Sequence, residues 1–497
     1  MGKEKWNPIG QAWLRSELNL PVPEPAVESY VGAGARRTEV RGLRIVERYP
    51  RQYATDGSIA AHLRFALRHE PVDLGVLVAA LQAVEPAELE AWARREPTGA
   101  FSRRAWFFYE TFTGRTLDLE DVRAGNYVMA LDPARHIVSE RRNSPRHRVA
   151  DNLLGGPGLC PTVRRTPRLT EQIGMQVGGE GRALVESCDP VILARAVNYL
   201  YTKETRSSFA IEGETPGAGR TERFVAALKG AADFDPADVD ALVRLQGAIV
   251  DPRYAASGWR GLQNFVGSTA GEYREEVHFI CPRPEDLADL MQAWTRLTRR
   301  VVEGGVEPVA AAAVCAFAFV FIHPFEDGNG RIHRFLVHHV LARRGYSPPG
   351  VVFPVSAAIL RDQRSYEEVL DTFSRPILEF IQWDWTAGRE IAVGNETADL
   401  YRYFDATAFA EYLYDRVADT VRRDLKEELE FVTVFDRAFE AVREIVDMPD
   451  RRASLFVRLC MQSGRLSAAK RKRFPELDDA EIAAMEAAVR DAAEDGT

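Results

Sequence analysis

One short stretch, residues 323–334, concentrates side chains that could perform chemistry on a phosphate ester. It reads His-Pro-Phe-Glu-Asp-Gly-Asn-Gly-Arg-Ile-His-Arg. Gly328 and Gly330 allow the backbone to turn tightly and to approach a ligand closely. Arg331 and Arg334 are three residues apart, so on a helix they share one face and could bind phosphate oxygens. The stretch therefore predicts an anion-binding loop at the start of a helix.

Two further side chains of this loop could supply the chemistry itself. Asp327 could hold Mg²⁺ between phosphate oxygens, because Mg²⁺ is commonly bound by one or two carboxylates together with substrate phosphates. His323, at the other end of the loop, stands where a general base would meet an incoming nucleophile. The loop thus offers both a base and a phosphate cradle.

The flanking sequence predicts how this loop is held. An apolar run at residues 309–322 precedes it, and Ile332, Phe335, Leu336 and Val340 follow it at helical spacing. We expect a buried helix, a short polar loop and a second buried helix. The first run would be about 21 Å long as a helix, too short for a bilayer core of about 30 Å, so it is a core helix.

The loop matches every position of the signature H-x-F-x-[D/E]-G-N-G-R-x-x-R, so the chain resembles the Fic family of the Fic/DOC superfamily. The resemblance implies a protein adenylyltransferase (AMPylator), which transfers AMP from ATP to a Ser, Thr or Tyr hydroxyl of a target protein and releases pyrophosphate. It implies ATP as substrate, Mg²⁺ as cofactor on Asp327, and His323 as the catalytic base. The implied nucleotide-binding residues are Gly328, Asn329, Gly330, Arg331, Arg334 and, near adenine, Tyr366.

A second informative stretch is the helix expected at about residues 190–213. Asp189 followed by proline is a typical helix start, and Ser208 and Glu212 lie four residues apart. The end of the stretch resembles the inhibitory motif [S/T]-x-x-x-E-[G/N], which implies autoinhibition by Glu212 paired with Arg334. Two alternatives stay open: Glu212 is a surface carboxylate near a helix end, or Glu214, which lacks the spacing from Ser208, is the inhibitory residue.

Residues 262–281 contain two strand-like runs joined by a glycine-containing turn, which predicts a β-hairpin. Fic enzymes carry a hairpin flap in this place that holds the target's acceptor segment by strand-like pairing. The resemblance implies target docking by Leu262, Gln263, Asn264, Phe265, Val277 and Phe279. A merely structural hairpin is the alternative.

The composition is typical of a soluble globular protein of several domains. The chain has 497 residues, of which 46% are hydrophobic and 28% charged. A net charge of −9 argues against a chain-wide nucleic-acid or acidic-membrane surface. Residues 1–13 show no export signal, so we expect a cytoplasmic protein with reduced thiols. The scattered cysteines are Cys160, Cys188, Cys281, Cys315 and Cys460.

We expect a mostly α fold in three parts. Residues 1–185 would form an N-terminal domain of helices with a small hairpin, residues 186–390 the Fic helical bundle with its flap, and residues 391–497 a C-terminal helical domain. Within the first domain the sequence predicts a possible strand at residues 43–46. It also predicts a hairpin at residues 127–137 around Asp132-Pro133.

Two basic runs have alternative interpretations. Residues 141–169 are rich in Arg, Gly and Pro, and residues 470–473 read Lys-Arg-Lys-Arg. Each could contact nucleic acid, but we favour a solvated linker for the first and a solvated turn for the second. His338 and His339 would point about 100° apart on a helix, which disfavours one shared metal site.

Other functions stay open at this point. The same fold could perform a phosphotransfer or use another nucleotide donor, although Gly330 stands where Doc-like phosphotransferases carry a lysine. A non-catalytic nucleotide-sensing or DNA-binding regulator is also possible, although the intact His323 counts against it. The expected partner is a target protein, with self-modification and a homo-oligomer possible.

Overall fold

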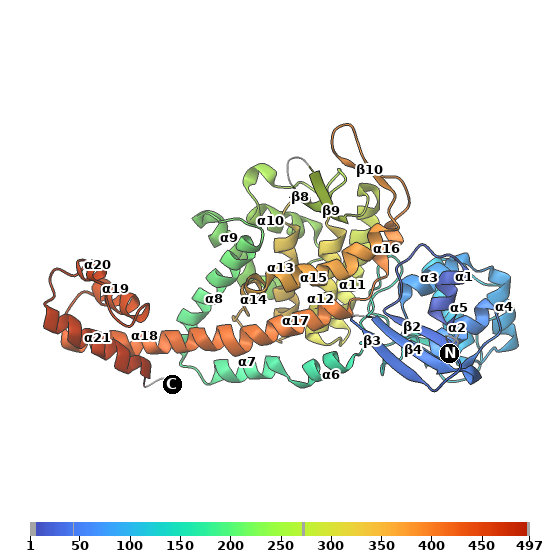
Figure 1. Cartoon of the computed structure of the whole chain (residues 1–497), viewed down its shortest axis with the longest axis horizontal. Helices are drawn as coiled ribbons and strands as arrows, with labels where there is room; N and C mark the ends of the chain where they lie inside the picture. The colour runs from blue at the N-terminus through green and yellow to red at the C-terminus, as the bar shows by residue number, and fades with distance from the viewer. Residues whose placement is uncertain (1–5, 43, 271–273, 495–497) are drawn as a thin grey trace, which may run out of the picture.

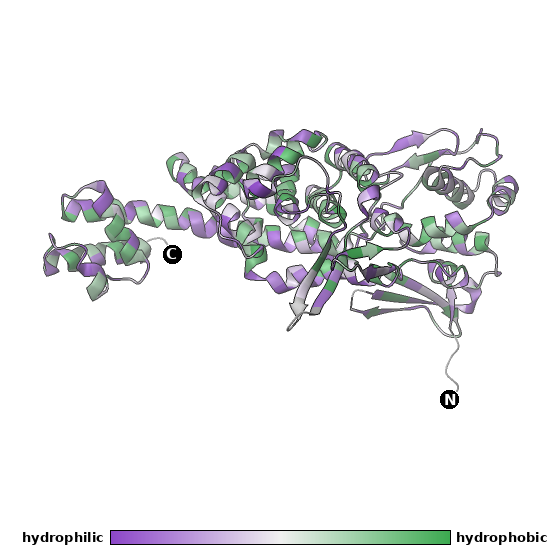
Figure 2. Cartoon of the chain, turned by 90° about the horizontal axis from the view of Figure 1, so that it is seen from above, coloured by the Kyte–Doolittle hydropathy of each residue, from purple (hydrophilic) through white to green (hydrophobic). Residues whose placement is uncertain are grey.

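The computed structural model describes residues 6–42, 44–270 and 274–494. The chain forms an N-terminal unit with a small sheet, a central helical bundle, and a small helical unit at the end of one long helix (Figure 1). Seen from above, the C-terminal unit stands apart from the bundle and is joined to it by that helix (Figure 2). The predicted mostly α fold is confirmed. Within the described ranges, no helix combines the length and apolar character needed to cross a bilayer.

The N-terminal unit packs a four-stranded sheet beside helices. The strand order is β1-β2-β4-β3, with β2 parallel to β4 and the other neighbours antiparallel. The strands are β1 (Asn7–Ile9), β2 (Val27–Gly32), β3 (Arg37–Arg41) and β4 (Arg44–Pro50). The helices are α1 (Gln11–Glu17), η1 (Arg51–Tyr53), α2 (Ile59–His69), α3 (Leu74–Ala83), α4 (Pro86–Arg95) and α5 (Ala100–Thr113). The single strand predicted at residues 43–46 overlaps the start of β4, and residue 43 itself lies outside the described residues.

The predictions for residues 127–169 are wrong. No hairpin forms around Asp132, because β5 (Val128–Met129) pairs in parallel with β7 (Val149–Asp151), which β6 (Arg142–Ser144) joins on its other side. Residues 141–169 are not a solvated linker either, since they contribute buried side chains to two cores. These side chains include Val149, Leu153, Leu154, Leu159, Cys160, Val163 and Leu169.

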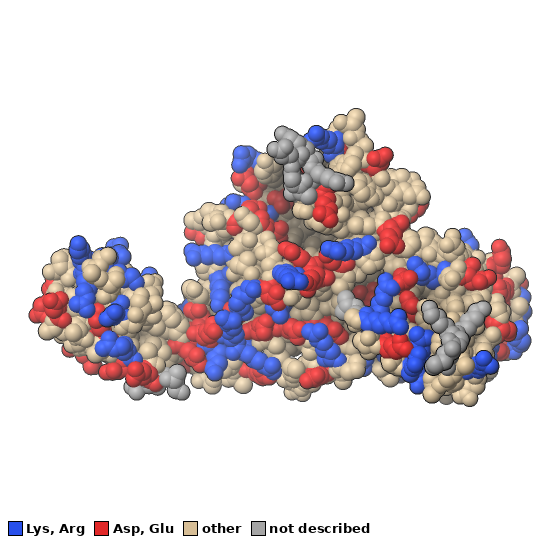
Figure 3. All heavy atoms as spheres, in the orientation of Figure 1, with Lys and Arg blue, Asp and Glu red and all other residues tan. Residues whose placement is uncertain are grey.

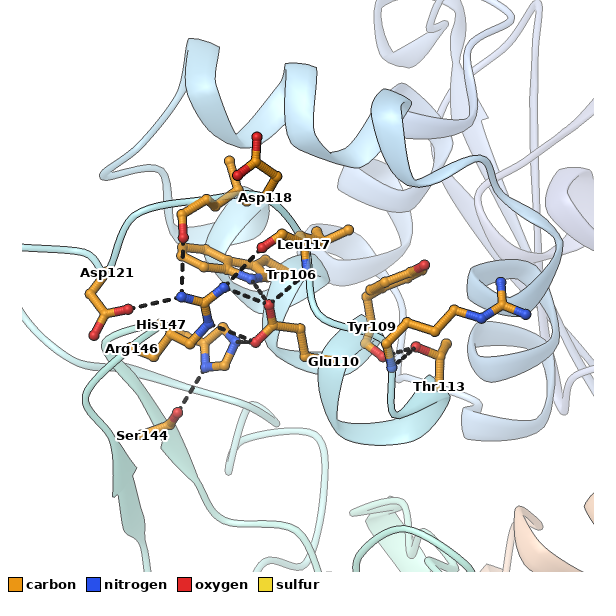
Figure 4. A network of polar contacts seen from close by, with 12 residues as sticks. Trp106, Tyr109, Glu110, Thr113, Leu117, Asp118, Asp121, Ser144, Arg146 and His147 are labelled. Carbon is orange, nitrogen blue, oxygen red and sulfur yellow. Dashed lines mark hydrogen bonds and ion pairs between the residues drawn. The ribbon is translucent and has the colours of Figure 1, made fainter.

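The arginines that made this segment look like a linker have internal partners. Arg146 donates through Nε to Glu110 Oε2 at 2.9 Å and through Nη1 to Asp121 Oδ1 at 2.9 Å. His147 Nε2 lies 2.8 Å from the same Glu110 oxygen (Figure 4). The Arg146 bonds hold the pKa of Glu110 down at about 2 although burial opposes the shift. These partners are far away in sequence, so local composition gave no sign of them.

The central bundle is built around α12 (Pro308–Ile322), which is buried along nearly its whole length. A helix that is apolar all round must be enclosed on every side, and α12 packs against α11 (Leu287–Glu303), α13 (Asn329–Arg343) and α17 (Thr407–Asp419). The other helices of the region are α6 (Pro167–Gly174), α7 (Val177–Glu186), α8 (Pro190–Ile211), α9 (Ala218–Lys229), η2 (Ala231–Asp233), α10 (Val239–Ile249), η3 (Pro252–Tyr254), η4 (Pro284–Asp286), α14 (Val355–Arg361), α15 (Gln363–Leu378) and α16 (Ala398–Arg402). The expected pair of buried helices with a short loop between them is present.

The buried cores do not follow the predicted domain bounds. The core around α12 includes Leu154 and Val177, which precede residue 186, and Phe409 and Val417, which follow residue 391. A separate C-terminal core begins only at Ala438. The helix α17 continues through a π-helical turn, η5 (Thr420–Leu425), into α18 (Lys426–Ile445), so no linker marks the boundary. The remaining C-terminal helices are α19 (Asp450–Met461), α20 (Ala468–Arg471) and α21 (Asp479–Glu494).

Two hairpins project side by side from the bundle (Figure 1). The predicted one is present as antiparallel β8 (Phe265–Ala270) and β9 (Arg274–Ile280), with an irregularity between Val266 and Gly267. The second, β10 (Trp383–Trp385) with β11 (Ile391–Val393), was not predicted. The ring of Trp385 meets the ring of Phe265 edge to face at 5.5 Å, so the two hairpins are in contact.

Charged side chains of both signs are interspersed over the face in Figure 3. Several pair across elements, as Arg422 does with Glu180 at 2.7 Å. Within the basic run at residues 470–473, Arg471 Nη2 lies 3.2 Å from the buried Glu486. That arginine, whose side chain is 37% exposed, therefore pairs at the surface with a carboxylate of the C-terminal unit.

Candidate active site

The candidate base, His323, ends α12 and begins the loop. It adopts a left-handed conformation with φ 53°, a strained one for a residue with a side chain. Its Nδ1 lies 3.1 Å from the carbonyl oxygen of Val320, which favours the tautomer with the proton on Nδ1. Burial lowers the pKa of His323 to about 4, and the nearby charge of Arg260 adds to that effect. The ring is therefore neutral at pH 7, with Nε2 available to accept a proton.

Asn329 gives the loop its shape. Its Oδ1 accepts from Phe325 N at 3.0 Å, and its Nδ2 donates to Phe325 O at 2.7 Å. The side chain is 1% exposed. Asn329 therefore closes the loop on itself, and its amide is not free to reach a phosphate as the nucleotide-binding role would require.

The two glycines stand where a side chain would obstruct the loop. Gly328 has φ +92°, and a Cβ there would lie 3.1 Å from Val250 Cγ1. A Cβ on Gly330 would lie 2.3 Å from Glu212 Oε1. The Glu212 carboxylate therefore sits directly over Gly330 at the N-terminus of α13, a position that favours anions.

Arg334 is the partner of Glu212, as the inhibitory motif implies. Arg334 Nη2 donates to Glu212 Oε1 at 2.8 Å and to Ser208 O at 2.7 Å, and Nε donates to Ser208 Oγ at 3.0 Å. The Arg334 side chain is 1% exposed. Burial raises the pKa of Glu212, but the Arg334 charge and hydrogen bond outweigh it and hold the pKa below its usual value. Glu212 is thus a carboxylate at neutral pH.

Arg331 is held by two other acids. Its Nη2 donates to Asp327 Oδ1 at 2.7 Å. Its Nη1 lies 3.0 Å from Glu214 Oε1, at ion-pair distance but without the alignment of a hydrogen bond. The other Glu214 oxygen accepts from Arg220 Nη1 at 2.9 Å. From the sequence, Glu214 was an alternative to Glu212 as the inhibitory residue, whereas in the structure each acid pairs with its own arginine.

Asp327 fits the expected Mg²⁺ ligand in its chemistry. Its side chain is half exposed at the edge of the loop. Oδ1 accepts from Gly328 N at 2.6 Å and from Arg331 Nη2. Among the described residues Oδ2 has no hydrogen-bond donor, so it could bind a cation beside substrate phosphates. The described residues contain no group of three or more His, Cys, Asp or Glu side chains that could hold a metal ion.

The ring of Tyr366, the residue expected near adenine, is buried. It is 6% exposed, and its ring lies between those of His333, at 6.2 Å, and Tyr412, at 6.0 Å. Burial raises the pKa of its hydroxyl to about 12, and the neighbouring Arg334 lowers it only in part. The expectation that Tyr366 lies near adenine stays a prediction, and in the described conformation its ring is on the buried face of α15.

The apolar residues expected to dock a target differ in exposure. Leu262 is 60% exposed, whereas Phe279 is 6% exposed and packs against Phe321 and Phe373. Phe279 therefore belongs to the core rather than to a docking surface. Phe265 and Val277 are partly buried.

Gln263 and Asn264 fix the base of the hairpin. Gln263 Nε2 donates to Cys281 O at 2.7 Å, which joins the residues before β8 to those after β9. Asn264 Nδ2 lies 3.4 Å from Glu326 O of the 323–334 loop. These two side chains therefore bond to backbone carbonyl oxygens of the protein itself.

The neighbouring histidines have separate partners. His338 Nε2 lies 2.8 Å from Glu204, and His339 Nδ1 lies 2.8 Å from Ala231 O. The two rings therefore do not converge on one site.

Arg260 is a further residue of this region that sequence analysis did not single out. Its Nε donates to the carbonyl oxygen of His323 at 2.8 Å, and its backbone N–H donates to Pro324 O at 2.8 Å. The sequence feature that could have identified Arg260 is its place directly before a predicted hairpin, with no acidic neighbour in sequence.

Comparison with known proteins supports the resemblance. Residues 236–341 match the model of the Fic/DOC family, a range that contains the whole 323–334 loop, and the inferred resemblance is confirmed. A protein adenylyltransferase Fic of Nematostella vectensis is 32% identical over 120 residues, 22% of this chain and 26% of that protein. The protein of the same name from Drosophila melanogaster is 41% identical over 88 residues, 17% of this chain and 18% of that protein. The chain thus spans about a quarter or less of these relatives' lengths.

Solved structures of similar proteins were also found. A Fic family protein from Desulfovibrio desulfuricans has a TM-score of 0.39 and 20% identity, covering 57% of this chain and 81% of that one. Fic-1 from C. elegans has a TM-score of 0.30 and 14% identity, covering 74% of this chain and 95% of that one.

Proposed function

We propose that this chain, whose residues 236–341 form a Fic/DOC domain, is a protein adenylyltransferase that transfers AMP from ATP to a side-chain hydroxyl of a target protein. The observation that carries the proposal is the convergence within one loop of a neutral histidine, an anion site over Gly330 and two buried guanidiniums. The names of the relatives support the same reaction.

The loop residues have distinct roles in the proposed reaction. The phosphates of ATP lie over Gly328 and Gly330 at the N-terminus of α13, where the backbone N–H groups meet them. Arg331 and Arg334 bind the outer phosphates and fix the α-phosphorus in line for attack. Mg²⁺, when bound to Asp327, would neutralise phosphate charge.

His323 supplies the base for the transfer itself. Its Nε2 takes the proton of the acceptor hydroxyl while that oxygen forms a bond to the α-phosphorus of ATP. The bond from the α-phosphorus to the bridging oxygen breaks, and pyrophosphate leaves with the electron pair. General-base assistance is worth about 10²–10⁴-fold in rate, and the positioning of the phosphates supplies much of the rest.

The described conformation is a restrained one in this proposal. Glu212 covers Gly330 and occupies Arg334, while Glu214 lies against Arg331. Both carboxylates would repel a triphosphate and occupy the groups that bind it. ATP can therefore reach its reactive position only after the segment at the end of α8 moves away.

The test is intact-mass analysis of the Glu212→Gly variant incubated with Mg²⁺ and, separately, with ATP, GTP, CTP or UTP. The proposal expects a mass increase equal to an AMP group with ATP alone. An increase equal to a phosphate group, or to another nucleotide, would replace this activity by a different transfer on the same fold. A cytoplasmic location and a homo-oligomer stay predictions.

A further inference from the structure

The segment that leads into the β8–β9 hairpin lies directly against the catalytic loop. The backbone N–H of Arg260 donates to the carbonyl oxygen of Pro324 at 2.8 Å. The ring of Trp259 packs against the ring of Phe325 with centroids 5.2 Å apart. The hairpin and the loop are therefore joined at their bases by backbone and side-chain contacts.

The Arg260 guanidinium binds three separate parts of the chain at once. Nε donates to His323 O at 2.8 Å, Nη1 donates to Leu262 O at 2.8 Å, and Nη2 donates to Pro282 O at 2.6 Å. The side chain is 4% exposed. No ion pair to Arg260 exists in the part of the chain that the structure describes. This buried cation is thus used entirely to hold backbone carbonyls.

These three carbonyls are placed where they matter for the reaction. Leu262 precedes β8 and Pro282 follows β9, so two of the bonds hold the two ends of the hairpin. The third bond holds the residue that carries the candidate base, in a strained left-handed conformation. The amide of His323 is held as well, since it donates to Phe319 O at 2.9 Å.

We propose that Arg260 is a positioning residue of the transfer reaction, which fixes both ends of the β8–β9 hairpin against His323 and thereby sets the acceptor hydroxyl in reach of the histidine ring. This inference rests on the proposed function, because it requires a hydroxyl delivered along the hairpin. A misplacement of about 1 Å can cost about 10²-fold in rate. The contacts of Arg260 do not reach residues 327–334, so ATP binding does not depend on them.

Two substitutions separate the shape of Arg260 from its charge. Lysine keeps the positive charge but donates from one nitrogen and cannot span three carbonyls. Glutamine lacks the positive charge and also lacks the planar guanidinium with its several N–H donors. Because the Arg260 charge contributes to the low pKa of His323, Arg260→Gln should raise that pKa, whereas Arg260→Lys should leave it nearly unchanged.

The experiment measures self-incorporation of AMP from labelled ATP in the Glu212→Gly background, with Arg260→Lys and Arg260→Gln. Both variants should lose about 10²-fold in kcat, while the Kd for ATP, measured by calorimetry, changes less than about threefold. Hydrogen exchange should quicken at residues 262–268, 275–282 and 323–326 in both. An NMR titration of the His323 ring should show the raised pKa in Arg260→Gln alone.

A matched control is Arg300→Gln. Arg300 is another buried arginine, 9% exposed, that donates to Ser139, Asp151 and the carbonyl of Gly155 and touches none of the loop residues 323–334. It reports the effect of losing a buried guanidinium by itself. Equal losses in the Arg300 and Arg260 variants, an unchanged kcat, or a loss that appears only in ATP affinity would overturn the positioning role.

If the proposed function is wrong, the measurements give a different set of results than if only the role of Arg260 is wrong. If the Glu212→Gly protein itself incorporates no AMP, the transfer activity is at fault, and the exchange and titration measurements still decide the role of Arg260. Unchanged exchange in the hairpin and loop together with an unchanged His323 pKa would overturn it.

Discussion

Glu214 Oε1 lies 3.0 Å from Arg331 Nη1, so a carboxylate two residues beyond Glu212 neutralises the other arginine of the 323–334 loop. Gly213, with φ +71°, provides the turn between the two acids. The end of α8 therefore covers the loop at two points, of which the sequence motif identifies one.

The first prediction concerns Glu212. Glu212→Gly removes the carboxylate over Gly330 and frees Arg334, so the initial rate of AMP incorporation from labelled ATP should rise roughly 5- to 150-fold, the range of a coupling of about 1–3 kcal/mol. Glu222→Gln on α9, an exposed position, is the control and should leave the rate unchanged. A rate in Glu212→Gly equal to or below that of the unaltered chain would refute the restraint.

The second prediction concerns Glu214. Glu214→Ala alone should raise the rate less than Glu212→Gly, because Arg334 and Gly330 stay covered. The double variant should exceed either single variant, since both guanidiniums then become available to the triphosphate. The measurement is the initial rate of AMP incorporation, together with the apparent KM for ATP, in all four proteins. If the double variant behaves like Glu212→Gly, the Glu214 contact does not contribute to the restraint.

The third prediction concerns the base. In the Glu212→Gly background, His323→Ala should reduce AMP incorporation by at least about 10²-fold, while the Kd for ATP, measured by calorimetry, stays within a few-fold. The control is the same substitution at His278 on β9. Among the described residues, the His278 ring bonds only to Ser268 of the same hairpin. Retained transfer in the His323 variant would assign the proton to another group.

The fourth prediction is the pH dependence of that step. The base must be neutral, and burial lowers the pKa of His323 from 6.5 to about 4. Activity should therefore stay level as pH falls from 7.5 through 6.5, and it should be lost only as pH approaches 4. The measurement is kcat against pH in the Glu212→Gly variant. A midpoint near 6.5 would mean that the ring is more exposed in the active form.

The sequence predicted the 323–334 region best, because the side chains that could perform the chemistry lie close together in the chain. His323, the two glycines and the two arginines lie within twelve positions, and α12 is so apolar that only burial explains it. The resemblance of residues 208–213 to the inhibitory motif implied the pairing of Glu212 with Arg334, which the structure contains, whereas the bond from Arg334 to Ser208 was not predicted.

Long-range partners explain what the sequence could not predict. The arginines of residues 141–169 look like a solvated run until Glu110 and Asp121 are placed beside Arg146. Tyr366 has the right residue type for an adenine contact, but the packing of α15 turns it inward. The contact of Arg260 with the carbonyl oxygen of His323 joins residues more than sixty positions apart, so the sequence near Arg260 does not predict it.

The last prediction concerns Asn329, which is expected to act on the loop rather than on the substrate. Its two hydrogen bonds to Phe325 close the turn between His323 and α13. Asn329→Ala removes both and leaves the amide and carbonyl of Phe325 buried without partners, which costs about 1–3 kcal/mol for each unsatisfied group. The free energy of unfolding in urea should fall by about 2–6 kcal/mol for the two groups together, and AMP incorporation in the Glu212→Gly background should fall with it. A residue that only bound phosphate would lower activity and leave stability unchanged, so stability identical to the unaltered chain would return Asn329 to a substrate-binding role.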